Sequence, residues 1–116
     1  MNVTDFYISE LGEFSRIKIT DAILHQVKRC LLDYIGVAYA GVSLSVDRMH
    51  AVLQLGEAGP CTVLGSTAKT DIYTAATVNG FTSHVIELDD GHRFAMLHLG
   101  APIITAMLAV AQKAKK

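Results

Sequence analysis

Residues 87–102 read Glu87-Leu88-Asp89-Asp90-Gly91-His92-Arg93-Phe94-Ala95-Met96-Leu97-His98-Leu99-Gly100-Ala101-Pro102. This segment contains three of the eleven carboxylates and two of the five histidines of the chain, and it separates two strongly apolar stretches with helical spacing. Charged groups inside an apolar chain cost free energy unless they are solvated or paired. The segment therefore divides the fold and marks the candidate site.

The residues before this segment predict a helix that runs into Glu87. Apolar and small side chains recur there at helical spacing, and Gly91 is the predicted C-terminal stop. Acids at this end face the negative pole of the helix dipole, where each costs some tenths of a kcal/mol. Lys or Arg at these positions would give a more stable helix, so the acids indicate a functional role in a site.

The residues after the segment predict a second helix whose first residue is Pro102, with its cap one or two positions earlier. The start of such a helix presents free backbone N–H groups, which bind anions. His92, Arg93 and His98 lie just before it. Acids on one side and cationic or N–H donors on the other predict a site that binds a carboxylate and moves its protons.

Several segments resemble the N-terminal helical domain of the MmgE/PrpD family. They are Cys30–Gly41, Thr62–Gly65, Asn79–His84, Glu87–His92 and His98–Pro102. That family includes 2-methylcitrate dehydratases, cis-aconitate decarboxylases and iminodisuccinate epimerases, and its members are several times longer, with a second α+β domain. The resemblance implies that residues 1–116 are the helical domain of a protein whose second domain is absent from this chain.

The resemblance also implies roles for the residues of the segment. His98 matches the family's active-site histidine before Gly-Ala-Pro, and we expect the catalytic groups to be His98, Glu87 and Asp90. The expected substrate-binding residues are Asp89, Gly91, His92 and Arg93. Many members have Asp at position 87, several have Thr at 91, and Pro is common at 99, where this chain has Glu, Gly and Leu.

The implied activity is that of a lyase on small di- or tricarboxylic acids, similar to 2-methylcitrate dehydratase and without a cofactor. The family's other catalytic lysine and histidine positions lie beyond residue 116, so we expect the chain alone to be inactive. The alternatives are an epimerase of the same family and a helical domain that acts only through association. A third is a solvated acidic turn in which Asp89 and Asp90 pair with Arg93.

Metal binding is the main competing chemistry for the segment. His92, His98, Asp89 and Asp90 are of ligand type, but their spacing matches no standard zinc or iron pattern and the resembled family is not known for metal catalysis. The sequence therefore predicts no metal site. His84 shares a helix face with Glu87 in the predicted helix, and its alternative role is that of a hydrogen-bonded helix histidine.

Composition narrows the possible partners. The net charge of −1 lacks the excess of Lys and Arg that nucleic-acid binding requires. The chain begins without the basic and apolar regions of a signal peptide, and the apolar run 103–111 is too short to cross a bilayer. We therefore expect a cytoplasmic protein that does not bind membranes. With Gly counted and Tyr left out, the apolar share is about 55%, above the usual range, which favours a homo-oligomer.

The predicted fold class is all-α, with at most one short β segment. We expect helices at 3–14, from 20 or 21 to 41, at 46–55, from 70 or 71 to 87 and at 102–116, with a turn at 42–45 and a β-type run at 61–64. That run needs a pairing partner, which we expect in the absent part of the family fold. Cys30 is predicted to be buried, Asp33 to have a structural hydrogen bond, and Gly36 to allow close helix contact.

Overall fold

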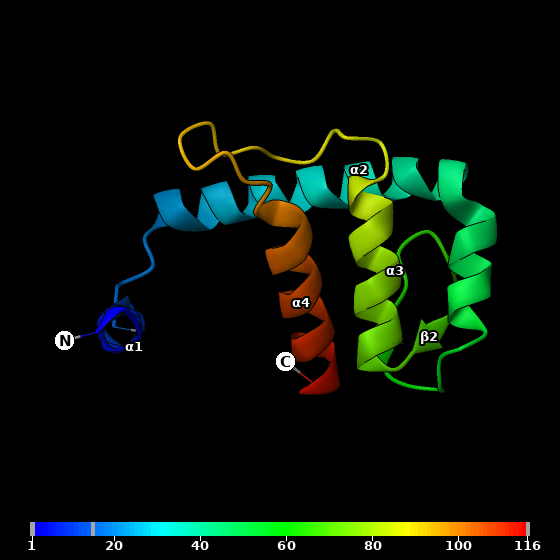
Figure 1. The fold of residues 1–116 in the computed structure, drawn as a ribbon, viewed down its shortest axis with the longest axis horizontal. Helices are drawn as coiled ribbons and strands as arrows, with labels where there is room; N and C mark the ends of the chain where they lie inside the picture. Colours follow the sequence, from blue (N-terminus) through cyan, green and yellow to red (C-terminus); the bar gives the residue numbers. More distant parts are fainter. Residues whose placement is uncertain (1, 15, 116) are drawn as a thin grey trace.

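The computed structural model describes residues 2–14 and 16–115, and expectations for residues 1, 15 and 116 lie outside them. Its elements are α1 (Val3–Phe14), α2 (Asp21–Leu53), β1 (Cys61–Thr62), β2 (Lys69–Thr70), α3 (Ile72–His84) and α4 (Gly100–Lys113). Figure 1 shows α2 across the top, α3 and α4 side by side beneath it, and α1 apart from the other helices. The predicted all-α class is confirmed.

The long helix α2 spans a region that the sequence divides into two helices and a turn. Thr20 caps its start, because the Thr20 hydroxyl oxygen accepts a hydrogen bond from the Ile23 N–H. Within the predicted turn 42–45, only Ser45 has non-helical dihedral angles, φ −138° and ψ 20°. Its hydroxyl donates to the carbonyl of Gly41 at 2.7 Å. The predicted break is therefore a kink inside one helix, since local serine hydrogen bonding bends a helix without ending it.

Close contact between α2 and α3 depends on Gly41 rather than on Gly36. A Cβ atom at Gly41 would overlap the carbonyl of Thr82 on α3, whereas a Cβ at Gly36 would meet nothing within 4 Å. The prediction for Gly36 is wrong, and Gly41 is not a helix end. The glycine lets the two backbones approach at the point where α3 crosses α2.

Gly41→Ala is expected to destabilise the chain by about 1–3 kcal/mol, because the added methyl group overpacks the α2–α3 contact. Gly36→Ala is the matched control, and we expect it to stabilise the helix by up to about 1 kcal/mol. Urea unfolding of the two variants beside the unchanged chain measures both effects. Equal effects of the two substitutions would contradict the assigned contact.

The short strands form a hairpin within the chain. β1 pairs with β2 in antiparallel fashion, with Cys61 opposite Thr70, so the expectation that the partner strand lies outside the chain is wrong. The Asn79 side chain on α3 donates to the carbonyl of Thr62 and accepts from the N–H of Leu64, each at 2.9 Å. This buried amide attaches the hairpin to α3, where it covers the core formed by Met49, Val63 and Val78.

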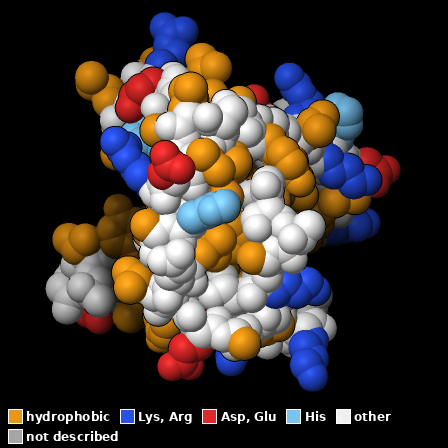
Figure 2. All heavy atoms as spheres, turned by 90° about the vertical axis from the view of Figure 1, so that its right-hand side faces the viewer, with side chains coloured by type: hydrophobic (Ala, Val, Ile, Leu, Met, Phe, Trp, Pro, Cys, Tyr) orange, Lys and Arg blue, Asp and Glu red, His pale blue; other side chains and the backbone are white. Residues whose placement is uncertain are grey.

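Much apolar surface remains uncovered. α1 has no buried residue, the radius of gyration is 15.9 Å, and a compact chain of this length has about 13 Å. Figure 2 shows hydrophobic side chains at the surface in several places on the face that it views, between the charged ones. Cys30 and Asp33, on the uncovered first half of α2, are exposed. The predicted burial of Cys30 is thus wrong for this chain.

The helix α2 is also long and apolar enough to cross a membrane, with a mean hydropathy of 1.3 in its 18-residue window. Core helices of water-soluble proteins pass the same test. Here α2 is kinked and packs on α3 and α4, but only 22% of that window is buried, so this packing accounts for part of its apolar residues.

Candidate functional site

The site forms where the end of α3, the loop 85–99 and the start of α4 meet. α3 ends at His84 with Val85 as its cap, so the helix stops three residues before the predicted Glu87, and Gly91 is not its stop. Glu87 has a positive φ of 54°, which non-glycine residues adopt rarely and mostly in turns. The turn reverses the chain and places Asp89 beside His84.

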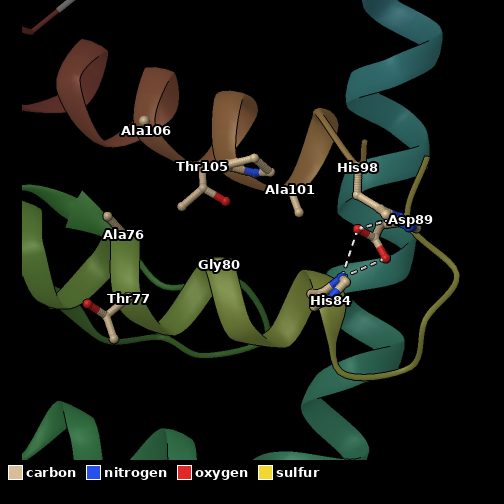
Figure 3. A pocket seen from close by; sticks show the side chains of 10 residues that line it. Ala76, Thr77, Gly80, His84, Asp89, His98, Ala101, Thr105 and Ala106 are labelled. Carbon is tan, nitrogen blue, oxygen red and sulfur yellow. Dashed lines mark hydrogen bonds and ion pairs between the residues drawn. The ribbon is translucent and has the colours of Figure 1, made fainter. Parts of the chain in front are cut away.

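Asp89 lies between two histidines. Its carboxylate is 2.9 Å from Nδ1 of His84 and 3.4 Å from Nδ1 of His98. The two imidazole rings meet edge to face with centroids 5.6 Å apart. The Asp89 side chain is 5% exposed, whereas each histidine side chain is 49% exposed. We call this group the triad; it consists of His84, Asp89 and His98 (Figure 3).

The acids raise the pKa of His84 above its ordinary value of 6.5. The hydrogen bond to Asp89 is the main cause, followed by the charge of Asp89, and the charge of Glu87 adds to both. Glu87 Oε1 lies 3.5 Å from His84 Nε2. His84 therefore stays protonated at a higher pH than a free histidine, and the triad can hold a proton near neutrality.

The raised pKa of His84 predicts a pH-dependent contribution to stability. Because protonation is favoured in the folded state, this contribution is complete below pH 6.5 and is lost as the pH rises through the raised folded pKa. An NMR titration of the imidazole resonances should show His84 titrating above its ordinary value of 6.5. Asp89→Asn should move the pKa of His84 back toward that value. A titration of His84 that Asp89→Asn leaves unchanged would contradict the assigned cause.

A pocket of about 640 Å³ lies between α3 and α4, with the triad at one end (Figure 3). Its lining residues are Ala76, Thr77, Gly80, His84, Asp89, His98, Ala101, Pro102, Thr105 and Ala106. The walls beyond the triad are small and mostly apolar, and no Lys or Arg belongs to the lining. The volume is in the range of small-molecule sites, so the pocket suits a small ligand whose polar end meets the triad.

Asp90 turns away from the triad to cap α4. Its Oδ1 accepts a hydrogen bond from the N–H of Gly100 at 2.6 Å, and Leu99 at the cap position makes no side-chain cap bond. Pro102 has no N–H to offer. The start of α4 was expected to bind a substrate anion, but it already binds the carboxylate of Asp90.

Asp90→Ala is expected to cost about 1 kcal/mol of stability, because it removes a helix cap. Asp90→Asn keeps a cap of similar strength while removing the charge, so it should restore most of that loss. Urea unfolding of both variants tests this role. A loss with Asn as large as the loss with Ala would show that charge, rather than the capping bond, is what matters.

The remaining predicted residues lie on the exposed loop that follows. His92 and Leu97 form an isolated bridge, and the Arg93 guanidinium stacks on the Phe94 ring at 5.1 Å from its centroid. A second hollow of about 430 Å³ is lined by Gly91, His92, Arg93, Met96, Leu97 and His98. His98 thus lines both the pocket and this hollow, and three of the predicted substrate-binding residues, Gly91, His92 and Arg93, line the hollow with it.

His84 is the residue that the sequence analysis did not assign to the site. Its spacing to Glu87 on a helix face was visible, but its main partner is Asp89, five positions away across a turn. Helical spacing does not predict this contact, because the helix has ended. The only sequence signal was the histidine itself, close to the acidic segment.

Comparisons with known proteins agree with the resemblance. Residues 12–116 match the profile of the MmgE/PrpD N-terminal domain. The chain is 30% identical, over 117 residues, to a cis-aconitate decarboxylase-like protein, oryM, of Aspergillus oryzae, covering 99% of the chain and 24% of that protein. It is 30% identical, over 96 residues, to the cis-aconitate decarboxylase of Aspergillus terreus, covering 81% of the chain and 20% of that protein. No solved structure matches the chain.

Proposed function

We propose, from the premise that the chain belongs to the MmgE/PrpD family, that it supplies the acid–base wall of an active site for small di- or tricarboxylic acids. The chain spans about a quarter of the length of the curated relatives it matches. The rest of the site then comes from further protein or from a second copy of the chain. The observation that carries the proposal is the triad at the end of a small-molecule pocket.

The triad suits proton transfer at a carbon atom. Asp89 faces Nδ1 of His98, which leaves Nε2 of His98 to take a proton from the substrate or give one to it. A buried carboxylate on the far side of an imidazole holds the ring in place and stabilises its charged form. In this assignment His98 is the acid–base group, and Asp89 takes the orienting role that the sequence analysis gave to no residue.

His84 and Glu87 have supporting roles in the proposal. His84 shares the Asp89 carboxylate, and its raised pKa favours an imidazolium, which attracts a substrate carboxylate. Glu87 lies on the other nitrogen of His84 and acts through that residue rather than on the substrate. Arg93 lines the adjoining hollow, and it is the candidate partner for a second carboxylate.

Two lyase reactions fit this arrangement. Dehydration of a 2-methylcitrate-like substrate removes a proton from carbon and needs a proton for the leaving hydroxyl group. Decarboxylation of cis-aconitate breaks a C–C bond to release CO₂, and the carbanion that remains takes up one proton at carbon. The similarity to cis-aconitate decarboxylases favours decarboxylation, although both reactions need one mobile proton beside a carboxylate.

The test is an assay of a full-length family protein whose N-terminal domain has this sequence. It would be supplied separately with cis-aconitate, 2-methylcitrate and iminodisuccinate, and CO₂ release, loss of water and epimerisation would be followed. We expect turnover of one of the two lyase substrates. Turnover of iminodisuccinate alone would favour the epimerase alternative, and turnover of none would favour an association domain.

A further inference from the structure

The side chains of the triad are also ligands for transition metals. One donor atom from each of His84, Asp89 and His98 lies within 4.8 Å of the other two. Two imidazole nitrogens and a carboxylate oxygen make up the protein ligands of many zinc and non-haem iron sites. The set of ligand-type residues weighed from the sequence included Asp89 and His98, which the fold keeps together. His84 takes the place of His92 beside them, and Asp90 caps α4 instead.

The geometry is close to what an ion requires. A tetrahedral Zn²⁺ site with bonds of about 2.1 Å holds its ligand atoms about 3.4 Å apart. Asp89 Oδ2 lies 2.9 Å from Nδ1 of His84 and 3.4 Å from Nδ1 of His98. Because all three donors are within 4.8 Å, no separation has to shorten by more than about 1.4 Å. Both rings are half exposed, so they have room to rotate toward a shared ion.

The surroundings favour a cation and leave it an open position. When both imidazoles are neutral, Asp89 and Glu87 make the cluster anionic, and no Lys or Arg lines the pocket to oppose the charge of the ion. The Asp89 side chain is buried, whereas both imidazole side chains are half exposed, and all three residues line the pocket. An ion held by three protein ligands keeps a fourth coordination position that is open to the pocket. This arrangement is typical of catalytic zinc sites, whereas structural zinc sites have four protein ligands.

We propose that the triad binds a divalent transition-metal ion of the Zn²⁺ type, and that this ion inhibits the proton transfer proposed above. Inhibition follows because a cation on one imidazole nitrogen opposes protonation of the ring, and because the ion takes Asp89 away from His98. The inhibitory part rests on the proposed function. The binding part rests only on the three donors.

Calorimetric titration of the 116-residue chain with ZnCl₂ tests the binding. We expect one ion per chain, and Co²⁺ in place of Zn²⁺ should give the visible absorption of a tetrahedral complex. Loss of a group that merely orients a ligand costs about 10–100-fold in affinity, so His84→Gln, Asp89→Asn and His98→Gln should each weaken binding by at least about tenfold. His25→Gln and His50→Gln, which change exposed histidines on α2, are the matched controls and should leave the affinity unchanged.

The outcomes separate the two parts of the proposal. Absence of saturable one-to-one binding, or equal weakening by the α2 controls, overturns the metal site. In the active full-length protein, Zn²⁺ should lower turnover and a chelator should restore it. Binding without any loss of turnover overturns the inhibitory part. If the full-length protein turns over no substrate, the proposed function fails, while the titration of the chain still decides the metal site.

Discussion

The 116-residue chain alone is expected to turn over 2-methylcitrate, cis-aconitate and iminodisuccinate very slowly. We expect a kcat at least about a thousandfold below ~1 per second, the lower end of typical enzyme values. The reason is the state of its pocket. Both histidine side chains are 49% exposed, and no Lys or Arg lines the walls. Water therefore competes for the imidazoles, and a substrate with two or three carboxylates meets too few cations to be held in a reactive position.

The measurement compares the chain with a full-length family protein that includes it, at equal concentration and with each substrate at saturation. Circular dichroism of the chain is the control, since a helical spectrum shows that low activity is not a failure to fold. Turnover by the chain at ~1 per second or more would contradict the view that this domain supplies only one wall of the site.

The starts of α2 and α3 were predictable because each depends on local sequence. Thr20 and Asp71 cap α2 and α3 with their own side-chain oxygens, as residues of these types do in most proteins. The prediction that Asn79-Gly80 continues a helix rather than forming a hairpin turn is also confirmed. In these places the local preference and the tertiary structure agree.

The sequence failed where a distant contact decides the structure. Gly36 and Gly41 look alike in an apolar helix, and only the position of α3 makes one of them indispensable. The partner of β1 was missed because β2 is two residues long and has no apolar alternation of its own. Asn79 supplies the bonds that hold this hairpin on α3, and a polar residue inside a helix does not reveal such a role.

The site was predicted by segment but not by residue. His98 was singled out, and the structure places it in the pocket. The two adjacent acids, by contrast, make different contacts: Asp89 lies between the histidines, whereas Asp90 caps α4. Neighbouring residues in a loop point in different directions, and the turn at Glu87 determines which one faces His84. The catalytic assignments of Glu87 and Asp90 stay predictions.

His98→Gln in a full-length protein with this domain is expected to lower kcat by about 10²–10⁴-fold, the usual contribution of a positioned acid–base group. Glutamine keeps a polar side chain of similar reach but cannot exchange a proton near neutrality. The melting temperature should change little, because His98 is half exposed and its contact with Asp89 is long, at 3.4 Å. His84→Gln should mainly raise KM, since His84 is proposed to attract a substrate carboxylate.

The pair of readouts distinguishes chemistry from packing at His98. The Nδ1 of His98 faces Asp89, and Ala101 of α4 lines the same pocket. If His98 had only a structural role, that role would be to attach the loop 85–99 to α4. Its replacement would then lower the melting temperature while the surviving protein kept its kcat, and that result would remove His98 from the proposed mechanism. His50→Gln, at an exposed position of α2, is the control for a histidine with neither a catalytic nor a structural role. Loss of kcat with an unchanged melting temperature, absent from His50→Gln, is the outcome that proton transfer by His98 requires.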